Sequence, residues 1–141
     1  MKAQFDHEKL RAYQEALRFV AWVDPLLERL PAALSARDQL DRASTSTVLN
    51  LAEGNGKRSH RDRCRYFDIA RGSVVECAAC LDVLWVKKKI GDAEMAEGKD
   101  ILLGTVAMVA GLIARFSDPE LHEETQAPYG TAETRGENEN D

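Results

Sequence analysis

Little in this sequence serves covalent cross-linking, membrane insertion or export. The chain has 3 cysteines among 141 residues, and a small, odd number does not indicate a disulfide framework. No stretch approaches the roughly 20 uninterrupted apolar residues of a membrane span. The opening stretch, MKAQFDHEKLRAYQ, lacks the apolar region of a signal peptide. We therefore expect a soluble, cytoplasmic protein that contacts no membrane, with one domain around a single core.

Residue types that bind metals or activate nucleophiles are also scarce and poorly spaced. Cys77 and Cys80 form a CxxC motif, but it lies in an apolar helical pattern with no second CxxC, so small buried side chains explain it better. The 3 histidines are isolated, and Glu53, Asp68 and Glu76 lack the Glu-x-x-His pattern of bundle metal sites. We predict no catalytic residue, no metal, no cofactor and no enzymatic activity.

The most informative part of the chain is a helical hairpin near its centre. Its turn, Gly-Asn-Gly at positions 54–56, tolerates positive φ, as is typical of a helix C-terminus. Ser59 then offers a side-chain oxygen to the free amides of a new helix, with Asp62 at the third helical position. One helix is therefore expected to end near Glu53 and the next to begin near His60.

The second helix of the hairpin has an apolar side and a basic side. At about 100° per residue, its apolar residues form one continuous stripe, which consists of Phe67, Ala70, Val74, Cys77, Leu81 and Leu84. Arg58, Arg61 and Arg65 gather on the opposite side, as in an amphipathic helix. The stripe predicts the core-facing side of this helix.

Arg63 points into the apolar arc and has two explanations. Its guanidinium leaves the end of the core by snorkelling, or it pairs with Glu53 across the turn. In the second case Asn50, Glu53 and Arg63 form a structural corner of the bundle. Removing the Glu53 carboxylate from a partly buried corner is expected to cost about 3 kcal/mol.

Three apolar residues of the same helix, Ile69, Cys80 and Val83, fall outside the stripe. A monomer would expose them to water, and exposed apolar patches mark contact surfaces. We predict that they form an oligomer interface.

Two cap residues predict where the earlier helices begin. Asp6 is the expected N-cap of the first helix, and Ser35, with Asp38 at its third position, is the expected N-cap of the second. Both helices then show apolar residues at three- and four-residue steps, which predicts one buried face for each.

The last helix is expected to begin at Asp92, after Gly91 stops the preceding helix. Gly104 and Gly111 are expected to let a neighbouring helix approach closely. Four helices joined by short loops predict an all-α fold, an up-down-up-down antiparallel four-helix bundle over residues 1–118.

Residues 119–141 differ in composition from this bundle. They hold seven acidic residues against Arg135 alone, with few apolar side chains, so we expect a disordered acidic C-terminal tail. Without this tail the chain is nearly neutral, and the stretch from Lys57 to Arg71 has six basic residues against Asp62 and Asp68.

The central hairpin resembles a known family. The matching residues are Asn50-Leu51-Ala52-Glu53-Gly54, Arg58-Ser59, Tyr66-Phe67-Asp68-Ile69-Ala70-Arg71-Gly72-Ser73 and Glu76. They are similar to the signature of the 23S ribosomal RNA intervening-sequence proteins, over roughly Leu10 to Phe116. The resemblance implies a four-helix bundle, a homopentamer and no established catalytic residue. It also implies a relation to the accessory protein of diversity-generating retroelements, which partners a reverse transcriptase and binds nucleic acid.

Two functions remain open. In the first, a non-enzymatic homo-oligomer binds the backbone of RNA or DNA through Lys57, Arg58, Arg61 and Arg65, with a reverse transcriptase or another protein as a further partner. In the second, the oligomer is a protein–protein interaction scaffold, and the arginines only solvate a helix face. The nearly neutral bundle favours the second function, and the resemblance favours the first.

Overall fold

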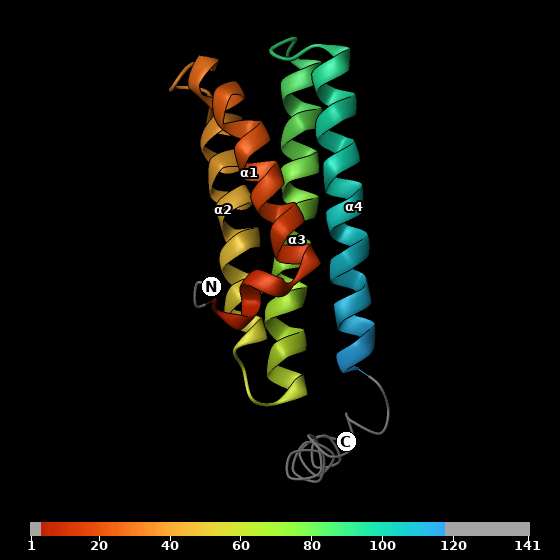
Figure 1. Ribbon diagram of the computed structural model, residues 1–141. Coiled ribbons are helices and arrows are strands. Elements are labelled where there is room, and N and C mark those ends of the chain that lie inside the picture. Colours follow the sequence, from red (N-terminus) through yellow and green to blue (C-terminus); the bar gives the residue numbers. More distant parts are fainter. Residues whose placement is uncertain (1–3, 118–141) are drawn as a thin grey trace, which may run out of the picture.

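The computed structural model describes residues 4–117, which form four long helices and a short 3-10 helix (Figure 1). Their bounds are Asp6–Lys9 for η1, Arg11–Arg29 for α1, Ser35–Asn55 for α2, His60–Val86 for α3 and Asp92–Phe116 for α4. Consecutive helices pack against each other, and α1 also packs against α4. The predicted all-α antiparallel four-helix bundle is confirmed, while the predicted tail lies outside the described residues. Within residues 4–117, no helix is long and apolar enough to cross a membrane.

The bundle has two ends, which we name by their connections. The loop end holds the connections at residues 30–34 and 87–91, and the hairpin end holds the α2–α3 turn at residues 56–59. Each end has its own group of buried apolar side chains. The six residues of the predicted α3 stripe are all buried, and Phe67 is fully buried near the hairpin end. Burying a phenylalanine of this kind contributes about 1.5–3 kcal/mol.

The α2–α3 turn needs its first glycine for packing rather than for backbone conformation. No glycine in residues 4–117 has a positive φ, and α2 continues past Glu53 to Asn55. A Cβ atom on Gly54 would lie 2.9 Å from both Cε1 of Phe67 and Cβ of Tyr66. At this point α2 therefore approaches α3 too closely for a side chain.

A second close approach involves α4, but not at the predicted glycines. A Cβ atom on Gly98 would lie 2.7 Å from Cδ1 of Leu81. Around Gly104 and Gly111 nothing lies within 4 Å of such an atom, so the prediction for these two glycines is wrong. They face open space, although α4 does begin at the predicted Asp92.

Two helix starts also differ from the prediction. The residues before α1 and α2 are Leu10 and Leu34, and neither makes a side-chain cap bond. Ser35 is instead the first residue of α2. Asp6 begins η1, and its carboxylate accepts a hydrogen bond of 2.8 Å from Nδ2 of Asn55. This bond ties the start of the described chain to the end of α2.

Helix α3 ends in a left-handed lysine rather than at a glycine. Lys88 has a φ of 61°, and its amide donates to the carbonyl of Trp85 at 2.9 Å. The amide of Lys89 donates to the carbonyl of Leu84 at 2.8 Å, which completes a Schellman motif. Gly91, the predicted stop, has a φ of −90° and directly precedes α4.

Candidate nucleic-acid interface at the hairpin end

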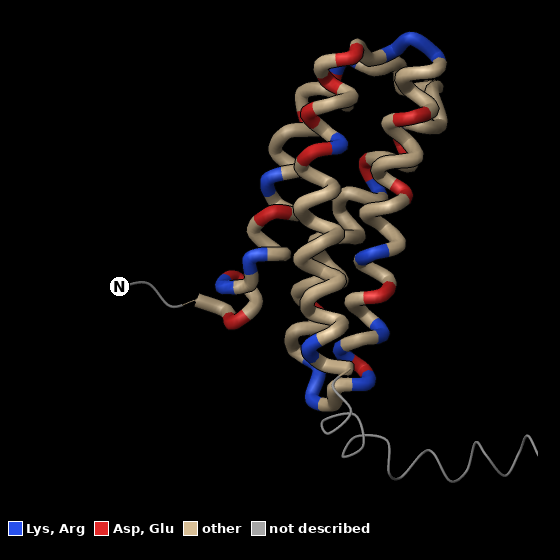
Figure 2. The backbone as a smooth tube through the Cα atoms, turned by 90° about the vertical axis from the view of Figure 1, so that its right-hand side faces the viewer, with Lys and Arg blue, Asp and Glu red and all other residues tan. Residues whose placement is uncertain are grey.

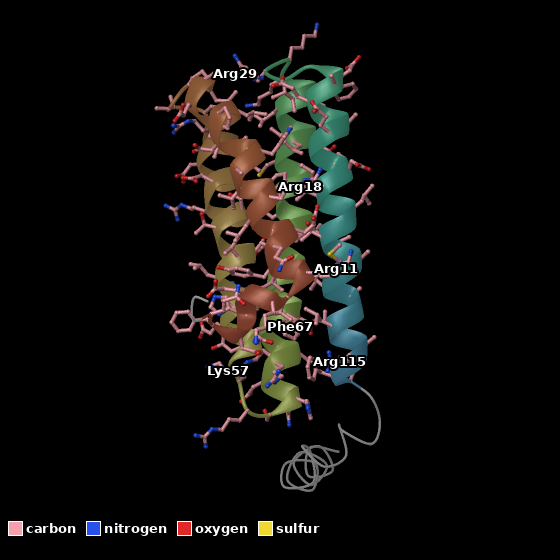
Figure 3. All side chains as sticks on the ribbon, in the orientation of Figure 1. Arg11, Arg18, Arg29, Lys57, Phe67 and Arg115 are labelled. Atoms are coloured by element: carbon pink, nitrogen blue, oxygen red, sulfur yellow. The ribbon has the colours of Figure 1, made fainter. Side chains whose placement is uncertain are left out.

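Basic residues gather at the hairpin end of the bundle (Figure 2). Lys57 and Arg58 lie in the turn, Arg61 and Arg65 lie near the start of α3, and Arg115 lies in the last turn of α4. Figure 3 shows Lys57 and Arg115 at the same end of the bundle, although the sequence separates them widely. Sequence reasoning missed Arg115, because no local pattern links the end of one helix to a turn two helices earlier.

Two interactions fix the place where α3 begins. The Ser59 side chain accepts a hydrogen bond of 3.0 Å from the amide of Asp62, which confirms the predicted cap. The Nε of Arg63 donates to the carbonyl oxygen of Lys57 at 2.8 Å. The same guanidinium lies 4.9 Å from the centre of the Phe116 ring. Arg63 therefore connects the turn, α3 and the end of α4.

The predicted corner of Asn50, Glu53 and Arg63 is wrong. Glu53 has a side chain that is 55% exposed, and it pairs with Nζ of Lys57 at 3.8 Å, which is an ion pair of the weak surface kind. Asn50 donates from Nδ2 to the carbonyl oxygen of Ser46, one turn back in α2, at 2.9 Å. Of the two explanations for Arg63, the Glu53 pair fails, because Arg63 reaches the turn backbone and an aromatic ring instead.

Arg61 and Arg65 share a surface hollow with two acidic residues. The hollow is lined by Arg61, Asp62, Cys64, Arg65, Asp68 and Ser117. The distance from Nη2 of Arg65 to Oδ1 of Asp62 is 3.8 Å, and both side chains are exposed. An exposed pair of this length is weak, and the positive end of the α3 dipole lies close by. The hollow thus offers two guanidinium groups to an anion, against the opposing carboxylates of Asp62 and Asp68.

Lys57 and Arg58 do not line this hollow. The Nζ of Lys57 lies 4.8 Å from the centre of the Tyr66 ring, and the guanidinium carbon of Arg65 lies 5.5 Å from it. Tyr66 is therefore an aromatic residue in contact with two cations. Sequence reasoning missed this role, because the angle of Tyr66 on the helix says nothing about the path of the preceding turn.

A comparison with protein families gives the relation of the chain to known proteins. The family model described as 23S rRNA-intervening sequence protein matches residues 8–111. The chain belongs to this family. No curated protein matches its sequence. In this member of the 23S rRNA-intervening sequence protein family, the matched span includes the α2–α3 turn and ends before Arg115 and Phe116.

Of the three residues predicted at an oligomer interface, two lie at the surface of this family member. Ile69 is 47% exposed and Val83 is 43% exposed, but Cys80 is only 4% exposed and belongs to the core. The prediction that a monomer would expose Cys80 is wrong, because α2 covers that side of α3. The hydroxyl oxygens of Ser46 and Ser73 hydrogen-bond at 2.8 Å across the same contact.

A second apolar surface, which sequence reasoning missed, is a groove between α3 and α4. It is lined by Val74, Val75, Ala78, Lys99, Leu102, Leu103 and Val106. Val75 and Leu103 are the most exposed of these apolar side chains, at 58% and 66%. The signal was present in the sequence, because residues 101–114 contain no charged side chain.

The two core cysteines are unsuited to thiolate chemistry. Burial raises the pKa of Cys77 to about 12, and the neighbouring Cys80 and Glu76 add to the shift. Burial also raises the pKa of Cys80. No cluster of three metal-binding side chains occurs in the part of the chain that the structure describes. The CxxC motif thus contributes small buried side chains to the core.

Proposed function

We propose that the protein is a non-enzymatic homo-oligomer that binds the phosphate backbone of RNA or DNA at the hairpin end. The observation that carries the proposal is the hollow in which Arg61 and Arg65 lie together at the start of α3. A helix N-terminus attracts anions, and arginine matches phosphate oxygens with two parallel donors. The family description refers to an intervening sequence of 23S rRNA and names no ligand, and we include RNA among the nucleic acids to be tested.

Binding is expected to be weak and tolerant of sequence. Asp62 and Asp68 line the same hollow as the arginines and repel phosphate. Tyr66 is partly buried and already in contact with Lys57 and Arg65. Contacts to phosphate position a protein on nucleic acid without reading its sequence. Several copies of a modest site in one oligomer raise the overall affinity.

The oligomer is proposed to be a ring, and the resemblance implies five chains of 15.7 kDa. Two different apolar surfaces support a ring. Ile69 and Val83 lie on one side of α3, and Val75 and Leu103 lie at the groove between α3 and α4. Two unlike surfaces that join head to tail generate a ring when the rotation between neighbouring chains closes, whereas a two-fold dimer uses one surface twice. Light scattering tests this part, since a monomer mass at micromolar concentration contradicts it.

A salt titration tests nucleic-acid binding. Labelled RNA and single-stranded DNA are titrated with the full chain, with Arg61→Ala/Arg65→Ala, and with the control Arg18→Ala/Arg42→Ala. The control removes two exposed arginines that form ion pairs within their helices, as Arg65 does, but lie outside the hairpin end. We expect the affinity of the full chain to fall by about 0.7–0.9 log units per log unit of salt for each phosphate neutralised.

The double variant should bind more weakly and show a shallower salt slope, while the control should match the full chain. If neither nucleic acid binds the full chain at about 50 mM salt, the proposal is wrong. The interaction scaffold then becomes the better function. The scaffold function is favoured by the two carboxylates in the arginine hollow. If it is correct, we expect the double variant to capture protein partners as well as the full chain does. A reverse transcriptase or another protein partner remains a proposal that the resemblance alone supports.

A further inference from the structure

The described chain ends inside the proposed nucleic-acid surface. The ring of Phe116, the last residue of α4, stacks on His60, with 5.2 Å between the ring centres and 22° between the planes. The Oγ of Ser117 lies 3.4 Å from Sγ of Cys64, and both residues line the hollow that holds Arg61 and Arg65. Whatever follows Ser117 therefore starts beside these arginines.

The sequence that follows Ser117 has the opposite charge. Residues 118–141 contain eight acidic side chains and one arginine. Four of the acids come within the first seven positions, and they are Asp118, Glu120, Glu123 and Glu124. Because an extended chain spans about 3.3–3.6 Å per residue, Glu120 is at most about 10 Å along the chain from Ser117. No long connection is needed to bring a carboxylate to the hollow.

We propose that residues 118–141 bind the hairpin-end surface of their own chain and compete there with the phosphates of nucleic acid. The competition rests on the proposed function, whereas the binding of the segment does not. Tethering gives the segment a local concentration in the millimolar range, so a few weak ion pairs are enough for it to occupy the surface. Asp62 and Asp68 oppose the segment as they oppose phosphate, which keeps the contact reversible. Salt screens ion pairs of this kind.

Carbodiimide cross-linking tests the contact without nucleic acid. The reagent joins carboxylates to amines, so the full chain carries Arg61→Lys/Arg65→Lys, which keeps both charges and places two amines in the hollow. The matched control is Arg18→Lys/Arg42→Lys. At low salt we expect mass spectrometry to find links from the acidic segment to positions 61 and 65, several-fold more than to positions 18 and 42. High salt should abolish these links.

Two results overturn the proposal. One is an equal yield of links at the test and control positions. The other is the appearance of light–heavy links in the statistical proportion, about half of all links, when equal amounts of isotopically labelled and unlabelled protein are unfolded, mixed and refolded together, because the segment then reaches another copy. Links without this light–heavy fraction support the contact.

The competition is tested by neutralising the acids of residues 118–141 with glutamine and asparagine in the full chain. We expect RNA affinity to rise several-fold at low salt and to converge with that of the parent at high salt. If the segment competes at the hollow, the gain should be much smaller when the acids are neutralised in the Arg61→Ala/Arg65→Ala variant. A general charge effect would give the same gain in both backgrounds. RNA binding without links and without a gain refutes the inference but leaves the proposed function intact. Links together with no RNA binding by either the parent or the neutralised variant refute the proposed function but not the contact.

Discussion

The two ends of the bundle use their charges differently. At the loop end, Arg29 of α1 forms a two-bond ion pair with Glu94 of α4, and one of its bonds measures 2.6 Å. Arg37 donates from Nε to the carbonyl oxygen of Leu27 at 2.7 Å. At the hairpin end, Lys57 of the α2–α3 turn pairs with Glu53 in the last turns of α2, at 3.8 Å. Charged side chains at the loop end therefore hold neighbouring helices together.

The pKa shifts follow the same division. The hydrogen bond from Arg29 is the largest cause that lowers the pKa of Glu94, and the bond from Glu94 raises the pKa of Arg29. Cations bound this firmly are poor candidates for a ligand, whereas cations in long surface pairs exchange partners readily. We therefore propose the hairpin end for binding, because the ion pairs of Lys57 and Arg65 there are long, in contrast to the short pair of Arg29.

The largest expected effect concerns the close approach of α2 and α3 at the hairpin end. Gly54→Ala should lower the free energy of unfolding by about 1–3 kcal/mol, because Cβ of Tyr66 is fixed to the backbone and lies 2.9 Å from the new atom. Gly111→Ala is the control, and it should stabilise α4 by up to about 1 kcal/mol, since its Cβ meets open space. Chemical denaturation measures both, and a neutral Gly54→Ala variant would show that the helices separate easily.

The second prediction compares one glutamate from each end. Glu94→Gln should cost about 1 kcal/mol at neutral pH, because a two-bond ion pair between α1 and α4 is lost. Glu53→Gln should cost less than about 0.5 kcal/mol, because its pair is long and exposed. This value replaces the larger cost expected for a buried corner. Equal costs for the two variants would remove the contrast between the ends.

The Glu94 contribution has a defined pH dependence. The pKa of Glu94 is lower in the folded chain than its ordinary value, so its stabilisation is present above the unfolded-state pKa. It should disappear as the pH falls through the folded-state pKa. Thermal unfolding of the parent and Glu94→Gln should therefore differ at neutral pH and converge in acid.

The third prediction concerns the strained residue at the loop end. Lys88→Gly should stabilise the protein by about 0.5–1 kcal/mol, because Lys88 has a φ of 61° and glycine adopts that conformation without a Cβ penalty. Lys87→Gly removes the same charge at a residue with a φ of −78°, so it should not stabilise. A gain in Tm for both variants would point to charge relief rather than backbone strain.

The smallest effect on stability should come from the proposed binding residues. Arg61→Ala with Arg65→Ala should change the free energy of unfolding by less than about 0.5 kcal/mol, because the Arg65 pair is exposed. Thermal unfolding checks this value. A cost above about 1 kcal/mol would mean that these arginines are structural, and a loss of RNA affinity in the variant would then carry less weight.

Features that depend on local sequence were predictable. The apolar stripe of α3, the Ser59 cap and the start of α4 at Asp92 all follow from periodicity and capping chemistry. The failures involve contacts between helices. Cys80 is buried because α2 lies over it, and Gly54 is required by the nearness of α3. A helical wheel shows on which side of the helix a residue lies, but it does not show which neighbouring helix covers that side.

The candidate site was predictable only in its α3 half. Arg61 and Arg65 were identified from one helix face, but the contributions of Arg115 and Ser117 come from the end of α4. Arg63 was expected either to leave the core by snorkelling or to pair with Glu53, and its observed partners are a backbone carbonyl and a ring. The partners of Arg63 depend on where α2 ends. This helix extends past Glu53 to Asn55.

The packing of Phe116 has a consequence for motion. The last turn of a helix usually frays, because its carbonyls lack partners within the helix. In α4 the terminal ring lies among His60, Arg63 and Phe67, and the amide of Ser117 still donates to Ile113 at 2.9 Å. Hydrogen exchange at the end of α4 should therefore be as slow as at the start of α3, so that the two helix ends open together rather than one by one.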